Sequence, residues 1–183
     1  MSNNMRVGTS NVGLEVDEDA RLKELASYRV FGTKSEPVFD DLAEIVRIRF
    51  DVPIAIVSFV GESEAHFKSH LGIEFESAPR LATFCDQTIH QDKPVIVYDA
   101  RHDARYKDNP FVTGAPYVQF YAGVRIVTPS GIAIGAVSAL DTITRSPGKS
   151  DVEFMAGVAK LIMNILEMRR NGFTGPGALK SQR

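Results

Sequence analysis

The stretch from residue 84 to residue 142 constrains the fold of this chain more than any other. It predicts a short helix, a strand, an irregular connector with one turn of helix, and then a long hairpin. No segment in this stretch matches a catalytic motif. A sheet that is covered by loops and short helices is how a protein builds a small-molecule pocket. The stretch therefore favours a receptor over an enzyme.

An antiparallel sheet is predicted from two hairpins and one further strand. Residues 54–60 are almost all apolar, which indicates a strand that is buried on both faces and central in its sheet. Residues 66–71 are expected to pair back on it as a half-exposed strand. Residues 119–127 and 132–140 form the second hairpin, and residues 94–98 form another strand. We therefore expect at least five strands, mostly antiparallel.

Three helices are indicated outside this stretch. The acidic residues 17–19 suit the beginning of a short helix. Ser35 is a good N-cap for the long amphipathic helix that follows it. Ser150 and Glu153 have capping-box spacing at the start of the last helix, which is expected to end at residues 171–172.

The last helix carries two apolar stripes, which is more apolar surface than one contact with a sheet requires. The stripes are Phe154, Val158, Leu161, Ile165 and Met168, and Met155, Ala159, Ile162 and Leu166. Some of this surface therefore needs another partner, and we expect a homodimer.

The order of elements predicts an α+β protein with an antiparallel sheet of five to six strands. The two long helices are expected to cover one face together, and the loops at 72–81 and 100–118 to cover the other. Loops of this length in a compact domain tend to be functional. Residues 17–172 are interpreted as one domain, between a flexible N-terminal segment at 1–16 and a flexible tail or linker start at 173–183.

Composition excludes several classes of function. With 183 residues, of which 44% are hydrophobic, the chain has room for one domain with a core. A net charge of -2 and a pI near 6.1 give no field that would steer it onto nucleic acid or anionic lipid. The apolar runs are under half of the ~20 residues that span a membrane, and the N-terminus lacks the apolar core of a signal peptide. Together with the single cysteine, Cys85, these features predict a cytoplasmic protein that binds neither nucleic acid nor membrane.

Several segments, taken in their order, resemble the GAF family of sensory domains, in the branch common at the front of bacterial histidine kinases and diguanylate cyclases. The resemblance runs from about residue 21 to residue 169 and rests on Phe39-Asp40-Asp41-Leu42, Val52-Pro53-Ile54-Ala55-Ile56-Val57-Ser58, Phe84-Cys85, Asp99-Ala100-Arg101, Asp108-Asn109-Pro110-Phe111-Val112, Phe120-Tyr121-Ala122-Gly123 and Gly131-Ile132-Ala133-Ile134-Gly135. It implies a GAF-like (PAS-like) six-stranded antiparallel sheet, a ligand pocket on the loop-covered face, and dimerisation through the terminal helices. The partner it implies is a downstream kinase or diguanylate cyclase domain.

The chain also departs from the pattern of this family. After Phe84-Cys85 it continues with Asp86-Gln87-Thr88, where this branch usually has a small residue and a histidine. The sequence lacks both the cysteine-histidine pair of bilin-attaching members and the signature of cyclic-nucleotide-binding members. The resemblance therefore implies neither of these ligands, and we expect no cofactor and no metal.

Cys85 is the best candidate for reactive chemistry. Its place near the start of the predicted short helix would favour the thiolate, because the helix dipole is positive there. The alternative is a small buried apolar side chain. His90, five residues further along the helix, would point ~140° away from it and fails as a catalytic partner. Free methionine sulfoxide reductases are built on a GAF-like fold and use more than one cysteine, whereas this chain has no resolving thiol.

The candidates for binding a small molecule are Phe67, Phe84, Cys85, Thr88, Asp99, Tyr106, Asn109, Phe111, Phe120 and Tyr121. The phenylalanines and Tyr121 fall on or beside the sheet face that the loops should cover, where they either line a pocket or fill it as core. Phe120 and Tyr121 point to opposite faces of one strand, so only one of them can face the pocket. Asp99 either fixes a polar ligand or caps the connector, and Asn109 most simply caps the helical turn that follows it.

We therefore interpret the chain as a non-catalytic sensory or regulatory domain that binds a small molecule and signals through dimeric terminal helices. Occupancy of the pocket would shift the population between two arrangements of those helices. Two alternatives stay open: a small thiol-dependent redox enzyme that uses Cys85, similar to a methionine sulfoxide reductase, and a purely structural dimerisation module with a collapsed pocket.

Overall fold

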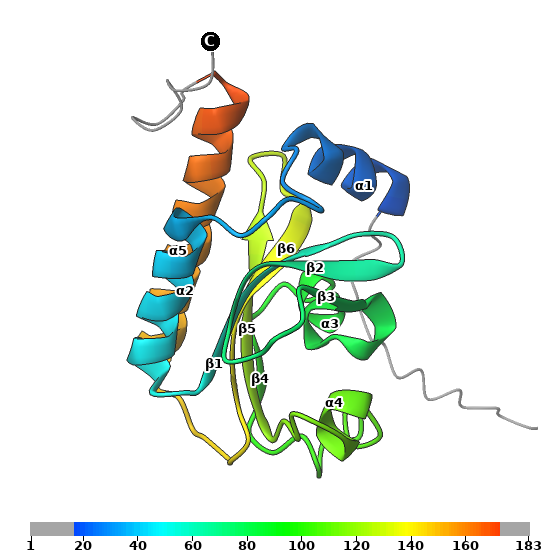
Figure 1. Ribbon diagram of the computed structural model, residues 1–183, viewed down its shortest axis with the longest axis vertical. Helices are drawn as coiled ribbons and strands as arrows, with labels where there is room; N and C mark the ends of the chain where they lie inside the picture. Colours follow the sequence, from blue (N-terminus) through cyan, green and yellow to red (C-terminus); the bar gives the residue numbers. More distant parts are fainter. Residues whose placement is uncertain (1–16, 173–183) are drawn as a thin grey trace, which may run out of the picture.

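The computed structural model describes residues 17–172, in which six strands form one antiparallel sheet (Figure 1). The strands are β1 (Ile54–Val60), β2 (Glu64–Leu71), β3 (Ser77–Pro79), β4 (Val95–Val97), β5 (Phe120–Val127) and β6 (Ala133–Asp141). Their order across the sheet is β3-β2-β1-β6-β5-β4. The expected α+β fold is confirmed. The segments predicted to be flexible, 1–16 and 173–183, lie outside the described residues.

Two long helices, α2 (Pro37–Phe50) and α5 (Lys149–Arg170), pack against the same face of the sheet. The shorter helices are α1 (Glu18–Ser27), α3 (Phe84–Ile89) and α4 (Pro110–Thr113), with a 3-10 turn, η1 (Arg80–Ala82). Figure 1 shows α2 and α5 side by side along one face, whereas α3 and α4 lie on the other side of the sheet. The predicted pairing of the two long helices is therefore confirmed. No helix within residues 17–172 combines the length and the apolar character that crossing a membrane requires.

β1 and β6 form the centre of the sheet, and every residue in both strands is buried. They pair with each other, with Val57 opposite Val137. Since successive side chains point to opposite faces, Val57 and Ala139 join the core under α2 and α5, whereas Ile56 and Leu140 join a second core on the other face. The sheet thus separates two hydrophobic cores, and β1 is the central strand that was predicted.

A partly buried ionic network connects α1 to the rest of the domain. Arg21 of α1 is fully buried and donates hydrogen bonds to Glu18 and, at 2.5 Å, to the backbone oxygen of Val60. Arg80 of η1 also binds Glu18, and its Nε lies 2.6 Å from the carboxylate of Asp86 in α3. The hydrogen bond from Arg21 lowers the pKa of Glu18 from its ordinary 4.5 to about 2. The network therefore joins α1 to α3.

The N-cap predicted for α2 at Ser35 is wrong by one residue. Glu36 is the N-cap, and its side chain makes no capping hydrogen bond. Instead its carboxylate binds Lys68 at 2.6 Å and Arg169 at 2.7 Å. Contacts to β2 and α5 thus decide where α2 begins, in place of a local capping preference.

The start of α5 is also displaced from the predicted capping box of Ser150 and Glu153. Gly148 is the N-cap, and Asp151 accepts a hydrogen bond from the backbone N–H of Gly148 at 2.8 Å. The helix therefore begins at Lys149 and not after Ser150. Its end, with Asn171 as C-cap, agrees with the prediction.

The prediction that β2 is half-exposed is wrong. Most of its residues are buried, because the connector between α1 and α2 covers one of its faces. His66 Nε2 donates to the Thr33 carbonyl oxygen at 2.7 Å, and Lys68 Nζ donates to Thr33 Oγ1 at 2.6 Å. The edge strand β3 was not predicted, since its three residues are too few to show a period.

We expect Gly135→Ala to destabilise the fold, because the backbone of β1 lies against that position. A Cβ at residue 135 would lie 2.1 Å from the backbone oxygen of Ser58, which cannot move without separating the two central strands. Chemical denaturation should show a loss of at least about 2 kcal/mol in the free energy of unfolding. The control is Gly157→Ala on α5, where a Cβ meets nothing within 4 Å and stability should stay equal or rise by up to ~1 kcal/mol. Equal effects of the two substitutions would contradict this account.

Candidate ligand-binding site

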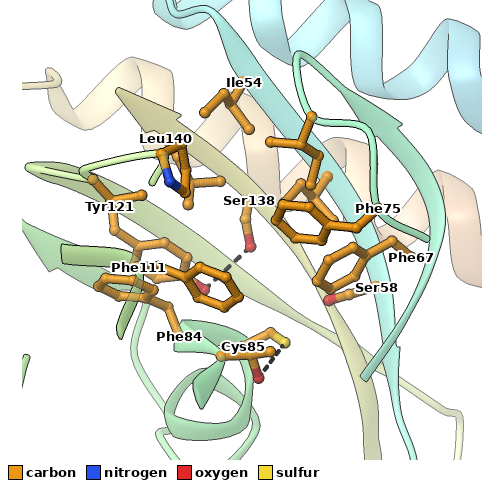
Figure 2. A pocket seen from close by; sticks show the side chains of 15 residues that line it. Ile54, Ser58, Phe67, Phe75, Phe84, Cys85, Phe111, Tyr121, Ser138 and Leu140 are labelled. Carbon is orange, nitrogen blue, oxygen red and sulfur yellow. Dashed lines mark hydrogen bonds between the residues drawn. The ribbon is translucent and has the colours of Figure 1, made fainter. Parts of the chain in front are cut away.

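A cavity lies between the sheet and the segments that cover its second face (Figure 2). β1, β2, β5 and β6 form its floor, and α3, α4 and the loops around residues 73–75 and 116–118 form its walls and roof. Its volume is about 40 Å³. Fifteen residues line the cavity, and none of them carries a charge.

Aromatic rings make up much of the cavity wall. Phe67, Phe75 and Phe111 stand in a row, with ring centroids 5.9 Å apart in the first pair and 5.6 Å apart in the second. The Phe84 ring stacks on Tyr121 at 4.8 Å. Figure 2 shows Phe67 and Phe75 on one side of the cavity, and Tyr121 and Phe84 on the other. The space therefore has aromatic rings on both sides.

Hydroxyl groups add a polar element to the floor. Tyr121 Oη lies 2.6 Å from Thr88 Oγ1 and 3.1 Å from Ser138 Oγ. The Thr88 hydroxyl also donates to the Phe84 carbonyl oxygen, one turn back in α3, at 3.1 Å. Burial raises the pKa of Tyr121, so its hydroxyl stays protonated. These groups are the means by which an otherwise apolar cavity can orient a ligand.

Cys85 lines the cavity but is only 5% exposed. Its thiol donates to Thr83 Oγ1 at 3.1 Å, and burial raises its pKa above the ordinary value. Desolvation therefore outweighs the effect of the helix start, which was predicted to favour the thiolate. Within residues 17–172, no three His, Cys, Asp or Glu side chains come together in a group that could hold a metal ion.

Seven of the ten predicted residues lie at the cavity or directly behind it. Five line it: Phe67, Phe84, Cys85, Phe111 and Tyr121. Thr88 and Tyr106 lie one layer further back, where Thr88 binds the hydroxyl of Tyr121 and Tyr106 stacks on Phe84 at 4.5 Å. Binding of a ligand by these residues stays a prediction.

Asn109 supports α4 and does not line the cavity. Its side-chain oxygen accepts a hydrogen bond from the Phe111 N–H at 2.8 Å, which is the cap that the sequence predicts. Its Nδ2 donates to the Ala82 carbonyl oxygen at 2.9 Å. Asn109 therefore ties α4 to the end of η1 and positions the Phe111 ring.

The structure corrects the placement of Phe120 and Asp99, both of which lie away from the cavity. Phe120 is fully buried in the core under α2 and α5, because its neighbour Tyr121 occupies the cavity face of the strand. Asp99 binds Arg101 and His102 at the surface, and the hydrogen bond from Arg101 lowers its pKa. The Asp99 carboxylate also accepts a hydrogen bond from the Arg101 backbone N–H at 3.1 Å. Asp99 therefore caps the connector, which the sequence offered as the alternative to fixing a polar ligand.

Ten cavity residues were not predicted, and they fall into two groups. Five come from the central strands: Ile54, Ile56, Ser58, Ser138 and Leu140. Alternation could have identified these, since all five occupy even-numbered positions that face away from the long helices. The other five are Ile73, Phe75, Thr83, Pro116 and Val118. They come from irregular segments, in which no period indicates a direction.

Comparison with known proteins identifies a family and a relative. The sequence profile of the GAF domain matches residues 35–166. A cyclic di-GMP phosphodiesterase of Pseudomonas aeruginosa is 29% identical over 148 residues, which is 80% of this chain and 25% of that protein. The chain therefore spans about a quarter of the length of the curated relative it matches.

Solved structures with a similar fold include a GAF domain and an enzyme. The GAF domain of a phosphoenolpyruvate-protein phosphotransferase from Coxiella burnetii has a TM-score of 0.61 and 13% identity, with 87% of this chain and 100% of that one covered. The free methionine-R-sulfoxide reductase of Neisseria meningitidis, solved with its substrate, has a TM-score of 0.60 and 15% identity, with 84% and 86% covered. At such low identities the likeness concerns the fold and not the chemistry.

We expect the Cys85 thiol of the native protein to react slowly with Ellman's reagent at neutral pH. Burial raises its pKa and limits access, so the reaction requires the structure to open. The rate should be at least ~100-fold below that of the urea-unfolded chain, in which the thiol is free. Native labelling at pH 7 as fast as labelling of the unfolded chain would contradict this and would favour thiol chemistry.

Proposed function

This chain belongs to the GAF domain family, a family of sensory domains, and we propose that it is a non-catalytic regulatory domain that binds a small molecule in the cavity between sheet and roof. The observation that carries the proposal is the lining of that cavity, which combines apolar and aromatic side chains with a few hydroxyl groups and no charge. Ligand pockets in proteins have this composition.

The ligand we propose is small, and a ring-sized one enters by displacing part of the roof. The volume of about 40 Å³ is well below the ~300–1,000 Å³ of drug-sized ligand sites. Phe75 is best placed to move, because it lies outside the helices and strands and is 36% exposed. Its ring stacks on Phe111, so a ligand ring could contact Phe111 in its place.

Occupancy of the cavity is proposed to reach α1 through α3. α3 carries Phe84 and Cys85 at the cavity, and the next residue, Asp86, binds Arg80. Arg80 in turn binds Glu18 of α1. A shift of α3 would change this series of ion pairs, and the ligand would thereby favour one position of α1 over another.

The partner we propose is a signalling enzyme domain in the cytoplasm. The sequence resembles GAF domains that stand in front of histidine kinases and diguanylate cyclases. The relative from Pseudomonas aeruginosa is a cyclic di-GMP phosphodiesterase, of which this chain matches a quarter. The resemblance and the relative both support a regulatory role for this chain, beside a kinase domain or beside an enzyme of cyclic di-GMP turnover.

A homodimer through the outer face of α5 is part of the proposal. The inner stripe of this helix, with Met155 and Ile162, is buried against the sheet. Phe154, Leu161 and Met168 on the outer stripe are between 37% and 52% exposed. They recur every seven residues, which is the repeat by which helices of two chains pack along a common seam.

The two alternative functions receive less support. A thiol-dependent reductase would need an accessible Cys85, whereas this side chain is buried and its pKa is raised. The reductase from Neisseria meningitidis shares the fold with this chain at 15% identity. A structural module with a filled pocket would bind no ligand at all, and ligand titration distinguishes it from a sensor.

We expect small neutral arenes such as toluene and phenol to raise the melting temperature of the chain by several degrees, because they bind the folded state alone. Ile73→Phe should abolish the shift, since a phenyl group at this roof position would fill the cavity. Scanning fluorimetry at millimolar ligand measures both. The matched control is Ile48→Phe on α2, where the side chain is 66% exposed and the shift should persist. If no arene stabilises the wild-type chain, the binding proposal fails and a structural module is favoured.

Leu161→Glu should convert the dimer into a monomer, because a carboxylate in the seam would be desolvated without a partner. Light scattering at micromolar concentration should give the mass of two subunits for the wild type and of one for the variant. Lys160→Glu also places a carboxylate on an exposed position of α5, ~100° around the helix from Leu161 and away from the heptad stripe, and should leave the dimer intact. A wild-type mass of one 20.1 kDa subunit would overturn the dimer.

A further inference from the structure

The hydroxyl hydrogens in the cavity floor point in one direction, and Thr88 sets that direction. Thr88 Oγ1 lies 3.1 Å from the Phe84 carbonyl oxygen, which can only accept, and we take Thr88 to donate its single hydrogen to that oxygen. In this arrangement Tyr121, whose Oη lies 2.6 Å from Thr88 Oγ1, donates to Thr88. Ser138 in turn donates to Tyr121 Oη at 3.1 Å. All three hydrogens are thus committed to oxygens of the protein.

The other hydroxyl and thiol groups of the lining also donate their hydrogens to oxygen atoms of the protein. The Thr83 hydroxyl donates to the Arg80 carbonyl oxygen at 2.7 Å, and the Cys85 thiol donates to Thr83 Oγ1 at 3.1 Å. Ser58 donates to the Ala136 carbonyl oxygen at 3.2 Å. Among the fifteen lining residues, no hydroxyl or thiol hydrogen is therefore left for a ligand.

The polar side chains of the lining consequently offer a ligand lone pairs only. A hydroxyl oxygen that donates one hydrogen bond can still accept. Ser58 on β1 and Ser138 on the neighbouring β6 both line the cavity. They are diagonal neighbours, since Ser58 pairs with Ala136 and Ser138 pairs with Ile56, so the floor offers two such oxygens. A ligand that brings a hydrogen to this floor gains a hydrogen bond, whereas a ligand that brings only a lone pair loses its bond to water without replacement.

We propose that the cavity is specific for small neutral molecules that have a flat apolar body and one hydrogen-bond donor, such as a phenol or an N–H heterocycle of the indole type. The donor binds Ser138 or Ser58, and the ring lies between the stacked rings on the two sides of the cavity (Figure 2). The inference rests on the proposed function, since it names the class of ligand for the same cavity.

The same lining rejects anions. No lining residue carries a positive charge, and a buried carboxylate or phosphate that faces lone pairs would lose its hydration without gaining a partner. Nucleotides and cyclic dinucleotides belong to this excluded class, as do small organic acids.

Calorimetric titration of the full chain with phenol, toluene and anisole tests the proposal, because these ligands bring a donor, no polar group and an acceptor alone. Wild-type protein should bind phenol. In the double variant Ser58→Ala/Ser138→Ala, phenol should bind ~10-fold more weakly, whereas toluene affinity should change less than ~3-fold, since only phenol loses a hydrogen bond. When the affinities of one ligand for the two proteins are compared, the free energy of removing that ligand from water is the same in both and cancels. Benzoate should bind neither protein.

Thr88→Val is a second variant that acts on hydrogen-bond direction alone, since Thr88 does not line the cavity. Without Thr88 Oγ1 as acceptor, Tyr121 donates to Ser138, and the Ser138 hydrogen becomes free to bind a ligand. Anisole, which only accepts, should then bind ~5-fold to 10-fold more tightly than it binds the wild type. Toluene should bind both proteins equally.

The matched control is Ser69→Ala on β2. Ser69 is buried, its hydroxyl has no hydrogen-bond partner among residues 17–172, and it lies outside the lining, so the affinities for all three ligands should stay unchanged. If the ligands bind but neither cavity variant changes their relative affinities, the donor preference is wrong and the ligand-binding function stands. If none of the three binds the wild-type chain, both proposals are overturned.

Discussion

The contact between β1 and β6 at the middle of the sheet is the constraint on which the rest of the domain depends. The two backbones lie so close at Gly135 that a Cβ there would be 2.1 Å from the Ser58 carbonyl oxygen. Because both strands are buried on both faces, their alternation divides the interior into two cores. Two long helices complete one core with continuous apolar stripes. Short helices and loops complete the other, and a cavity is left where these smaller pieces meet the strands.

Ion pairs connect the helices with the strands and with one another. Glu36 at the start of α2 binds both Lys68 of β2 and Arg169 near the end of α5. Glu18 holds the buried Arg21 in the same way on α1. Lys68 and Arg21 are fully buried, so loss of either carboxylate would leave a buried charge with fewer partners. Arg21 also donates to the Val60 carbonyl oxygen of β1, and Lys68 belongs to β2, so both carboxylates help to tie a helix to the strands. This is the kind of contact that a regulatory domain can shift.

Periodic patterns predicted most of the fold, and long-range contacts explain what they missed. The central strand and the last helix follow from the spacing of apolar residues within each segment. The burial of Lys68 does not, because the connector that covers it lies more than thirty residues earlier in the chain. Alternation required that only one of Phe120 and Tyr121 face the cavity, but choosing between them needed the position of the long helices. Ser58 and Ser138 are small residues in apolar strands, and their role appears only when the neighbouring strand is in place.

α3 is the element in which contacts from the ionic network and from the cavity floor meet. The carboxylate of Asp86 accepts a hydrogen bond from Arg80 at 2.6 Å. Thr88, two residues further, lies ~200° around the helix, and its Oγ1 lies 2.6 Å from Tyr121 Oη in the cavity floor. One short helix therefore contacts the ionic network through one side and the floor through another. In the proposed function, a ligand that moves α3 would act on both contacts at once, through a helix of six residues.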